Sequence, residues 1–173
     1  MHGDARGERI GRGTLRPRQT GHAVRRTTPS DEEWCPMTEY ERSRTMPAQP
    51  EQVFDQAANV GQLDTWLPRE LHVEVEEPPA VTVHEDRSDQ DTSALLSARP
   101  EQMRLEWGTR AQGSYAGWLQ VAGLDAGASE VTVHLSFFDG SHDPGEQAVA
   151  DALDTSLRRL EEQVRLRTDN AAG

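Results

Sequence analysis

The chain has 173 residues, but only one of them is cysteine, none is lysine, and 5% are aromatic. The single cysteine, Cys35, excludes a disulfide framework within the chain, so we expect a reducing, cytoplasmic setting. All eighteen basic residues are arginine, which we interpret as the codon usage of a GC-rich bacterial genome. No stretch approaches the ~20 apolar residues of a membrane-spanning helix, and we therefore expect no membrane insertion.

Charge is distributed unevenly along the chain. Residues 1–36 carry seven arginines and five acids, whereas residues 37–173 carry eleven arginines and twenty-five acids, which is a net charge of −14. Nucleic acid phosphates require a cationic surface, and anionic membranes attract basic segments. The acidic body therefore disfavours a nucleic acid partner and an anionic membrane surface.

Residues 1–36 mix glycine, arginine and threonine and show no apolar periodicity. Such a segment buries too little apolar surface to offset the entropy of ordering, so we predict a disordered tail. It contains no apolar run of about 7–15 residues that would indicate a secretory signal. Two interpretations stay open: an upstream extension of a reading frame that starts at Met37, or a basic tail with a partner of its own.

From Met37 onward, apolar spacing predicts seven strands, two short helices and a long last helix. Pro50 suits the first turn of a helix at 50–58, and Pro68 stops a second helix at 60–66. Alternating apolar and polar residues predict strands at 39–46, 71–76, 81–85, 92–98, 102–107, 114–124 and 129–138. Their short connections indicate an antiparallel meander. Gly117 lies inside the sixth strand, where a glycine permits the bulges and sharp coiling of a cup-shaped sheet.

The last helix has the clearest signals. Asp143 is predicted as its N-cap, with Pro144 in the first helical position and Glu146 completing a capping box, and the helix is predicted to run to Arg167. Residues 169–173 are predicted as a disordered C-terminus. One face is apolar for about four turns, with side chains at Val149, Leu153, Leu157, Leu160 and Val164. This stripe must lie on the sheet.

Two segments carry a resemblance to a known family. Residues 43–54, Ser-Arg-Thr-Met-Pro-Ala-Gln-Pro-Glu-Gln-Val-Phe, resemble the opening strand, small-residue turn and first helix of the START-like superfamily, also called SRPBCC. Residues 63–68, Leu-Asp-Thr-Trp-Leu-Pro, are similar to the family's Leu-x-x-Trp-x-Pro segment. The resemblance covers about residues 38–168, and the superfamily includes polyketide cyclases and dehydratases, lipid-transfer domains and Hsp90-activator homologues.

This resemblance implies an α+β helix-grip fold for residues 37–168. A curved seven-stranded antiparallel sheet, with two short helices after its first strand, would hold a long C-terminal helix against it. A small hydrophobic molecule would be bound between the sheet and the helix, with no cofactor. Members share this cavity and differ in what fills it, so the resemblance indicates a fold more specifically than an activity.

Alternation along the strands and the stripe of the last helix predict which side chains line the cavity. For each residue taken singly, plain core packing is the favoured alternative, because a buried apolar side chain stabilises a fold by roughly 1.5–3 kcal/mol without any ligand. The predicted lining consists of Trp66, Trp107, Tyr115, Leu119, Phe137, Leu153 and Leu157. Trp118 lies on the opposite face from Tyr115 unless a bulge intervenes, and its direction stays open.

Polar groups inside the cup would supply any chemistry. Arg42 and Arg44 share one face of the first strand, and a buried guanidinium needs a carboxylate or an anionic ligand group. Arg44 is therefore a candidate catalytic residue, with Tyr115 as a candidate proton donor. The alternative is that both arginines extend to the edge of the sheet and pair with surface acids.

Three histidines raise the question of a metal site. His72, His84 and His134 alternate with charged or hydroxyl residues, which is typical of a solvated strand face. No HxH, HExxH or paired-cysteine spacing accompanies them, so we predict no metal site.

Three functions are compatible with these sequence patterns. The first is binding of a lipid-like or polyketide-like hydrophobic molecule in the cavity. The second is a polyketide cyclase or dehydratase, and the third is a protein-interaction module of the Hsp90-activator kind. A dry pocket has no group that moves a proton, so the polarity of the cavity discriminates the first from the second.

Overall fold

The computed structural model describes residues 37–109, 115–141 and 143–172. The predicted disordered tail at 1–36 lies outside the described residues, and so does Cys35. None of the helices in the described ranges has both the length and the apolar character that crossing a membrane requires.

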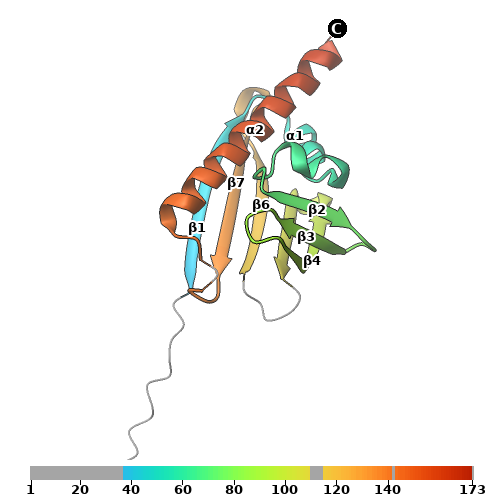
Figure 1. Ribbon diagram of the computed structural model, residues 1–173. Helices are drawn as coiled ribbons and strands as arrows, with labels where there is room; N and C mark the ends of the chain where they lie inside the picture. The colour runs from blue at the N-terminus through green and yellow to red at the C-terminus, as the bar shows by residue number, and fades with distance from the viewer. Residues whose placement is uncertain (1–36, 110–114, 142, 173) are drawn as a thin grey trace, which may run out of the picture. The chain divides into compact units, whose positions relative to one another are not determined.

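Seven strands form one antiparallel sheet (Figure 1). They are β1 (Thr38–Met46), β2 (Leu71–Val75), β3 (Ala80–Glu85), β4 (Gln90–Arg99), β5 (Arg104–Thr109), β6 (Tyr115–Gly123) and β7 (Ser129–Phe137). Their order in the sheet is β1-β7-β6-β5-β4-β3-β2, so β2 to β7 form a meander and β1 pairs with the last strand. The predicted seven-stranded antiparallel sheet is confirmed, and with the helices described below it makes an α+β helix-grip fold.

Two α-helices accompany the sheet. α1 (Pro50–Ala57) follows β1 and has its proline in the first turn, as predicted, because a proline lacks the N–H that this turn leaves unpaired anyway. α2 (Glu146–Ala172) is the long C-terminal helix and lies closest to β1, with further contacts to α1 (Figure 1). Short 3₁₀ turns, η2 (Pro100–Gln102) and η3 (Asp125–Gly127), join neighbouring strands.

The second short helix that the sequence predicts is present. It is a 3₁₀ helix, η1 (Val60–Thr65), and ends just before the predicted end at residue 66. Asn59 precedes it, and the Asn59 side chain accepts a hydrogen bond from the backbone N–H of Gly61. The 3₁₀ helix itself has six residues, and short 3₁₀ segments are common in such connections.

The start of α2 also corrects the prediction. The backbone N–H of Val149 bonds to the carbonyl of Gly145, so Gly145 is the N-cap and the helix begins at Glu146. Asp143 instead accepts bonds from the Gly145 N–H, at 2.8 Å, and from the Tyr40 hydroxyl, at 2.9 and 3.0 Å. Its carboxylate is therefore used for a turn and for a contact with β1, and Pro144 lies before the helix.

The end of α2 lies beyond the predicted end as well. The helix continues past Arg167 to Ala172 and so includes residues 169–172 of the segment predicted as a disordered C-terminus, while residue 173 lies outside the described residues. All five residues of the predicted apolar stripe are buried, ending with Val164, whereas Leu166 is 56% exposed. The last turns of α2 therefore lie beyond the buried apolar stripe on which the predicted end of the helix was based.

The core lies between the inner face of the sheet and the helices. Alternate residues of the strands meet the stripe of α2 and the apolar face of α1 in one cluster of buried side chains. Met46, Leu119 and Val131 on the sheet and Leu160 on α2 are 0% exposed. The prediction that the last helix packs on the sheet is confirmed.

Gly117 does not introduce the bulge that the sequence suggested. The ladder runs without interruption through Gly117, which pairs with Trp107 on β5 and Leu135 on β7. A Cβ at position 117 would lie 2.7 Å from two ring atoms of Trp107 and 2.7 Å from Cδ2 of Leu135. The glycine therefore makes room for the indole and the leucine on the inner face.

Candidate functional site

The seven residues predicted to line a cavity come together in the structure. All of them belong to the core cluster or pack directly against it on the inner side of the sheet. They therefore lie in one cluster of side chains, and their role as the lining of a ligand cavity stays a prediction. They are Trp66, Trp107, Tyr115, Leu119, Phe137, Leu153 and Leu157.

Burial divides these residues into two groups. Trp66, Leu119 and Leu157 are at most 2% exposed and are sealed by their neighbours. Trp107 and Tyr115 are only partly buried. A molecule arriving from solvent would meet this second group without displacing any core side chain.

The position of α2 explains this difference. The helix packs mainly on β1, α1 and η1, at one side of the sheet. Apolar side chains on the strands farther away, among them Val73, Leu96 and Trp107, pack against the core but stay partly exposed. The inner face is thus closed beside α2 and less completely covered toward β4 and β5.

An aromatic row crosses three neighbouring strands on this face. The ring centroid of Phe137 on β7 lies 5.9 Å from that of Tyr40 on β1 and 6.2 Å from that of Tyr115 on β6. Edge and tilted contacts at these distances stabilise aromatic pairs. The row links the start of α2, through the bond from Tyr40 to Asp143, to the partly exposed Tyr115.

Tyr115 is a potential proton donor on this surface. Burial raises the pKa of its hydroxyl above the ordinary value of 10.0, and the nearby carboxylate of Glu85 raises it further. The phenol therefore stays protonated at neutral pH. It can donate a hydrogen bond to an oxygen of a bound molecule.

The two arginines of β1 pair with acids of α2. Arg44 Nε lies 2.5 Å from the Glu161 carboxylate, and Arg42 Nε lies 3.9 Å from that of Asp154. Glu161 also bonds Arg165, one turn further along the helix. Both guanidinium groups thus lie where β1 meets α2, the arrangement that the sequence offered as the alternative to a catalytic Arg44.

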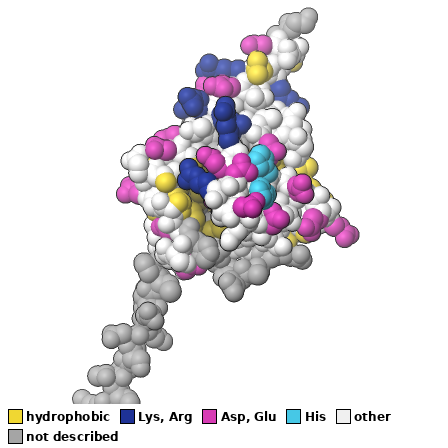
Figure 2. Space-filling model, viewed as in Figure 1, with side chains coloured by type: hydrophobic (Ala, Val, Ile, Leu, Met, Phe, Trp, Pro, Cys, Tyr) yellow, Lys and Arg dark blue, Asp and Glu magenta, His cyan; other side chains and the backbone are white. Residues whose placement is uncertain are grey.

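His72 and His84 lie opposite each other on β2 and β3, among acids. His84 Nδ1 bonds Asp91 at 2.8 Å, and this bond raises the pKa of His84. Asp86 lies 3.5 Å from Nε2 of His72 and 3.6 Å from Nε2 of His84. Figure 2 shows histidine side chains lying among acidic ones on one face. Within the described ranges, no group of three or more potential ligands has the geometry to hold a metal ion.

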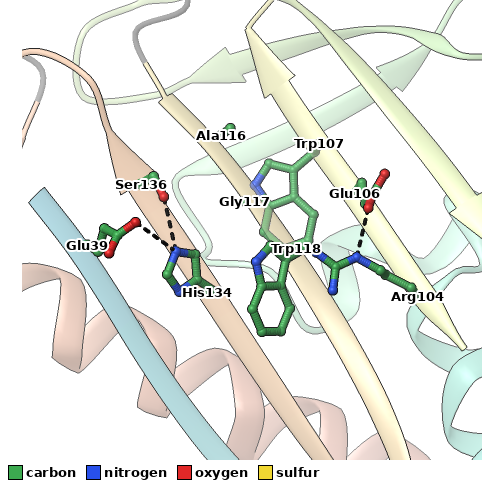
Figure 3. Close-up of a pocket in the computed structure, with 9 residues that line it drawn as sticks. All are labelled: Glu39, Arg104, Glu106, Trp107, Ala116, Gly117, Trp118, His134 and Ser136. Carbon is green, nitrogen blue, oxygen red and sulfur yellow. Dashed lines mark hydrogen bonds and ion pairs between the residues drawn. The ribbon is translucent and has the colours of Figure 1, made fainter. Parts of the chain in front are cut away.

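Two hollows of the described part of the chain lie outside the space between the sheet and α2. One, of about 240 Å³, lies between α1 and α2 and is lined by Gln52, Asp55, Val164, Arg167, Thr168 and Ala171. The other, of about 490 Å³, opens on the outer face of the sheet, away from α2 (Figure 3). Its lining comes from β1, β5, β6 and β7 and consists of Glu39, Arg104, Glu106, Trp107, Ala116, Gly117, Trp118, His134 and Ser136.

Strand register creates the outer hollow. One row of paired positions on this face carries large side chains, and the next row carries small ones across β5, β6 and β7. The large row contains Glu106, Trp118 and His134, and the small row contains Gly108, Ala116 and Ser136. The step between the two rows leaves space above the small residues.

Trp118 forms one wall and points outward, which answers the question that the sequence left open. The His134 imidazole stacks on it at 5.1 Å with an interplanar angle of 7°. The Arg104 guanidinium carbon lies 4.4 Å from its ring centroid, a cation–π contact. Figure 3 shows the indole between these two side chains.

This hollow was not predicted from the sequence. Alternation with hydroxyl residues assigned His134 to a solvated strand face, but the step between large and small rows depends on strand pairing. A tryptophan two residues from the small Ala116 on the same strand face was the available signal. This signal indicates a hollow only when the register of the neighbouring strands is known.

Comparison with solved structures places this fold. The Zhui aromatase/cyclase of Streptomyces sp. R1128 is 14% identical with a TM-score of 0.61, over 80% of this chain and 99% of that one. A START superfamily protein of Mycobacterium smegmatis is 12% identical with a TM-score of 0.61, over 74% and 97%. Identities this low show a shared fold.

The chain spans about half the length of one of these structures, the di-domain ARO/CYC BexL of the BE-7585A biosynthetic pathway. That protein is 17% identical with a TM-score of 0.60, over 76% of this chain and 47% of that one. No curated protein matches the chain. Residues 37–165 match the family described as polyketide cyclase / dehydrase and lipid transport. The chain therefore belongs to this family, within the START-like, SRPBCC superfamily.

Proposed function

We propose that the protein binds a small hydrophobic molecule, lipid-like or polyketide-like, on the inner face of the sheet beside α2. The observation that carries this proposal is the partial exposure of Trp107 and Tyr115 next to a sealed apolar core. Covering such aromatic surface is favourable, because large rings bring much apolar area out of water. Family membership supports the same site. The single cysteine supports a cytoplasmic setting, and the use of arginine without lysine supports a bacterial source.

Polar groups on this side favour a ligand that carries oxygen. The Tyr115 hydroxyl is a protonated donor. A chain or ring system that carries a carbonyl or hydroxyl group can accept this hydrogen bond, which a pure hydrocarbon cannot.

Two tryptophans of neighbouring strands offer a matched test of the binding face. The residue Trp107 borders the outer hollow, but its indole lies on the inner face over Gly117. The Trp118 indole lies on the outer face, and both residues are partly buried. Titration with the neutral fluorescent dye N-phenyl-naphthylamine should give binding roughly 10- to 150-fold weaker for Trp107→Ala, since losing an aromatic contact removes roughly 1.5–3 kcal/mol. Trp118→Ala should bind as the parent does. Equal affinity in all three proteins, or a loss confined to Trp118→Ala, would reject the inner face.

Catalysis on a polyketide-like chain is the second candidate, and the protonated Tyr115 is what favours it. A positioned phenol assists carbonyl chemistry by donating its proton. Tyr115 is the proton donor in this proposal. Arg44 is paired with Glu161 and has no role in it. With a poly-β-ketone thioester as probe, Tyr115→Phe should keep binding and lose cyclised or dehydrated product, measured by mass spectrometry. Product formation at an unchanged rate would exclude this role.

A further inference from the structure

A serine, a histidine and a glutamate meet on the outer face of the sheet, in the hollow of about 490 Å³. His134 and Ser136 are two residues apart on β7, so their side chains point to the same face. Glu41 is the register partner of His134 on the neighbouring strand β1. The binding function proposed above uses none of these residues.

Their distances follow the order of a nucleophile, a base and an orienting acid. Ser136 Oγ lies 3.0 Å from His134 Nε2. On the other side of the ring, His134 Nδ1 lies 3.4 Å from a carboxylate oxygen of Glu41. Nδ1 is buried and makes no hydrogen bond within the described residues, so this carboxylate is the acceptor it faces. A base that contacts both a hydroxyl and an acid is the arrangement that activates serine nucleophiles.

The ring that would act as base is held in place. Trp118 stacks against it nearly parallel, at 5.1 Å between ring centroids. A second carboxylate, that of Glu39, lies 3.8 Å from Nε2, farther away than Ser136 Oγ. Since a carboxylate carries no proton at neutral pH, the serine hydroxyl is the donor available to a neutral Nε2. The Glu41 carboxylate favours the tautomer with the proton on Nδ1.

The hollow supplies room for a substrate beside these groups. Ser136 and His134 both line it, and the small Ala116 next to Ser136 keeps the approach to the hydroxyl open. A volume of about 490 Å³ lies within the range of small-molecule pockets, roughly 300–1,000 Å³. Figure 3 shows the imidazole and the hydroxyl side by side at this opening.

We propose that Ser136, His134 and Glu41 form an acyl-transfer site for activated esters, separate from the inner binding face. Ser136 Oγ bonds to the acyl carbon while its proton passes to His134 Nε2. The bond to the leaving oxygen or sulfur then breaks, and the leaving group takes the proton from Nε2. Water attacks the acyl-serine by the same route and restores the hydroxyl. One ester and one water give one acid and one alcohol or thiol.

The strand context defines the substrate class. β7 is paired on both sides, with β1 and β6, so its backbone N–H groups are used in the sheet and do not form an oxyanion hole. Without such donors the oxyanion is less stabilised, at a cost of about 10²–10³ in rate. The site therefore suits acyl groups with good leaving groups, such as aryl esters and thioesters.

Covalent labelling tests the proposal on the wild-type protein. A fluorophosphonate probe should modify Ser136, identified by peptide mass spectrometry, and p-nitrophenyl acetate should leave an acetyl group there. Ser136→Ala should abolish both signals, and His134→Gln should slow labelling by roughly 100-fold. Absence of label on wild-type Ser136 would overturn the proposal whatever the variants do.

The chain offers matched controls. Ser43 is a serine of the same outer face whose hydroxyl bonds Thr132, and His84 is a strand histidine with an acid at Nδ1. Ser43→Ala and His84→Gln should label at the parental rate. Glu41 is a positioning residue, so Glu41→Gln should slow labelling at an unchanged melting temperature and Glu41→Asp should restore part of the rate. Equal rates for Glu41→Gln and the parent would remove Glu41 from the site.

Discussion

The two faces of the sheet carry opposite chemistry although the same strands build them. On β6, Leu119 and Val121 point inward and are buried in the core. Trp118 and Gln120 point outward. Trp118 stacks on the Arg104 guanidinium, and the Gln120 amide donates a hydrogen bond to the backbone carbonyl of Gln102. The inner face follows from the positions of apolar residues along each strand. The outer hollow follows from which residues of neighbouring strands lie opposite each other. Substitutions on the two faces should therefore differ in kind as well as in size.

The largest effect is expected for a deletion in the sealed core. Leu160 on α2 is 0% exposed, and Leu160→Ala should lower the free energy of unfolding by about 2–5 kcal/mol, through lost burial and the remaining cavity. Leu166 on the same helix is 56% exposed, and Leu166→Ala should change the free energy of unfolding by less than ~0.5 kcal/mol. Urea unfolding measures both. Equal losses would show that α2 does not pack as described.

Gly117→Ala should have the next largest effect. The new methyl group would press on Trp107 and Leu135, and overpacking of this kind costs about 1–3 kcal/mol. Gly140→Ala is the control, since a methyl group there meets no atom within 4 Å. Thermal unfolding compares the two. A Gly117→Ala protein as stable as the parent would mean that the indole does not lie over the glycine.

The ion pairs between β1 and α2 should contribute less to the free energy of unfolding. Glu161→Gln weakens the pair with Arg44, in which the glutamate is 13% exposed, and should cost about 1 kcal/mol. Asp154→Asn removes a longer and more exposed contact with Arg42, and should cost less than ~0.5 kcal/mol. Urea unfolding at low and high salt would reveal the difference. A larger loss from Asp154→Asn would contradict the assigned pairing.

The smallest effect should be visible only at alkaline pH. The pKa of Tyr115 is raised above 10.0 by burial, so the folded state holds this proton more tightly than the unfolded state. The resulting stability is present below the unfolded pKa and is lost as pH rises through the folded one. Melting temperatures measured from about pH 9 to about pH 11 should therefore fall less steeply for Tyr115→Phe. The same slope in both proteins would contradict the burial of the hydroxyl.

Much of the inner face could be predicted from the sequence because it follows from side-chain periodicity. Alternation on the strands and the stripe of α2 identified the seven residues that share the core cluster. The same patterns predicted the seven strands and their antiparallel arrangement. A two-residue or four-residue period is a local property, and a single sequence contains it in full.

Features that depend on tertiary partners were predicted less well. Asp143 has the sequence of an N-cap, but its carboxylate bonds Tyr40, which is far away in sequence. Gly117 accommodates an indole from a neighbouring strand. The outer hollow arises from the pairing of Ala116 with Ser136. No local pattern contains these relations, because each joins residues whose proximity is created by folding.

Indole N–H signals in nuclear magnetic resonance spectra test the central claim, that the inner face binds a hydrophobic molecule. Trp107 and Trp118 can be assigned with single Trp→Phe variants and followed while N-phenyl-naphthylamine is added. The account predicts that the Trp107 signal shifts in a saturable way while the Trp118 signal stays in place. A shift of Trp118 with Trp107 unchanged, or no shift of Trp107 at saturating dye, would contradict it.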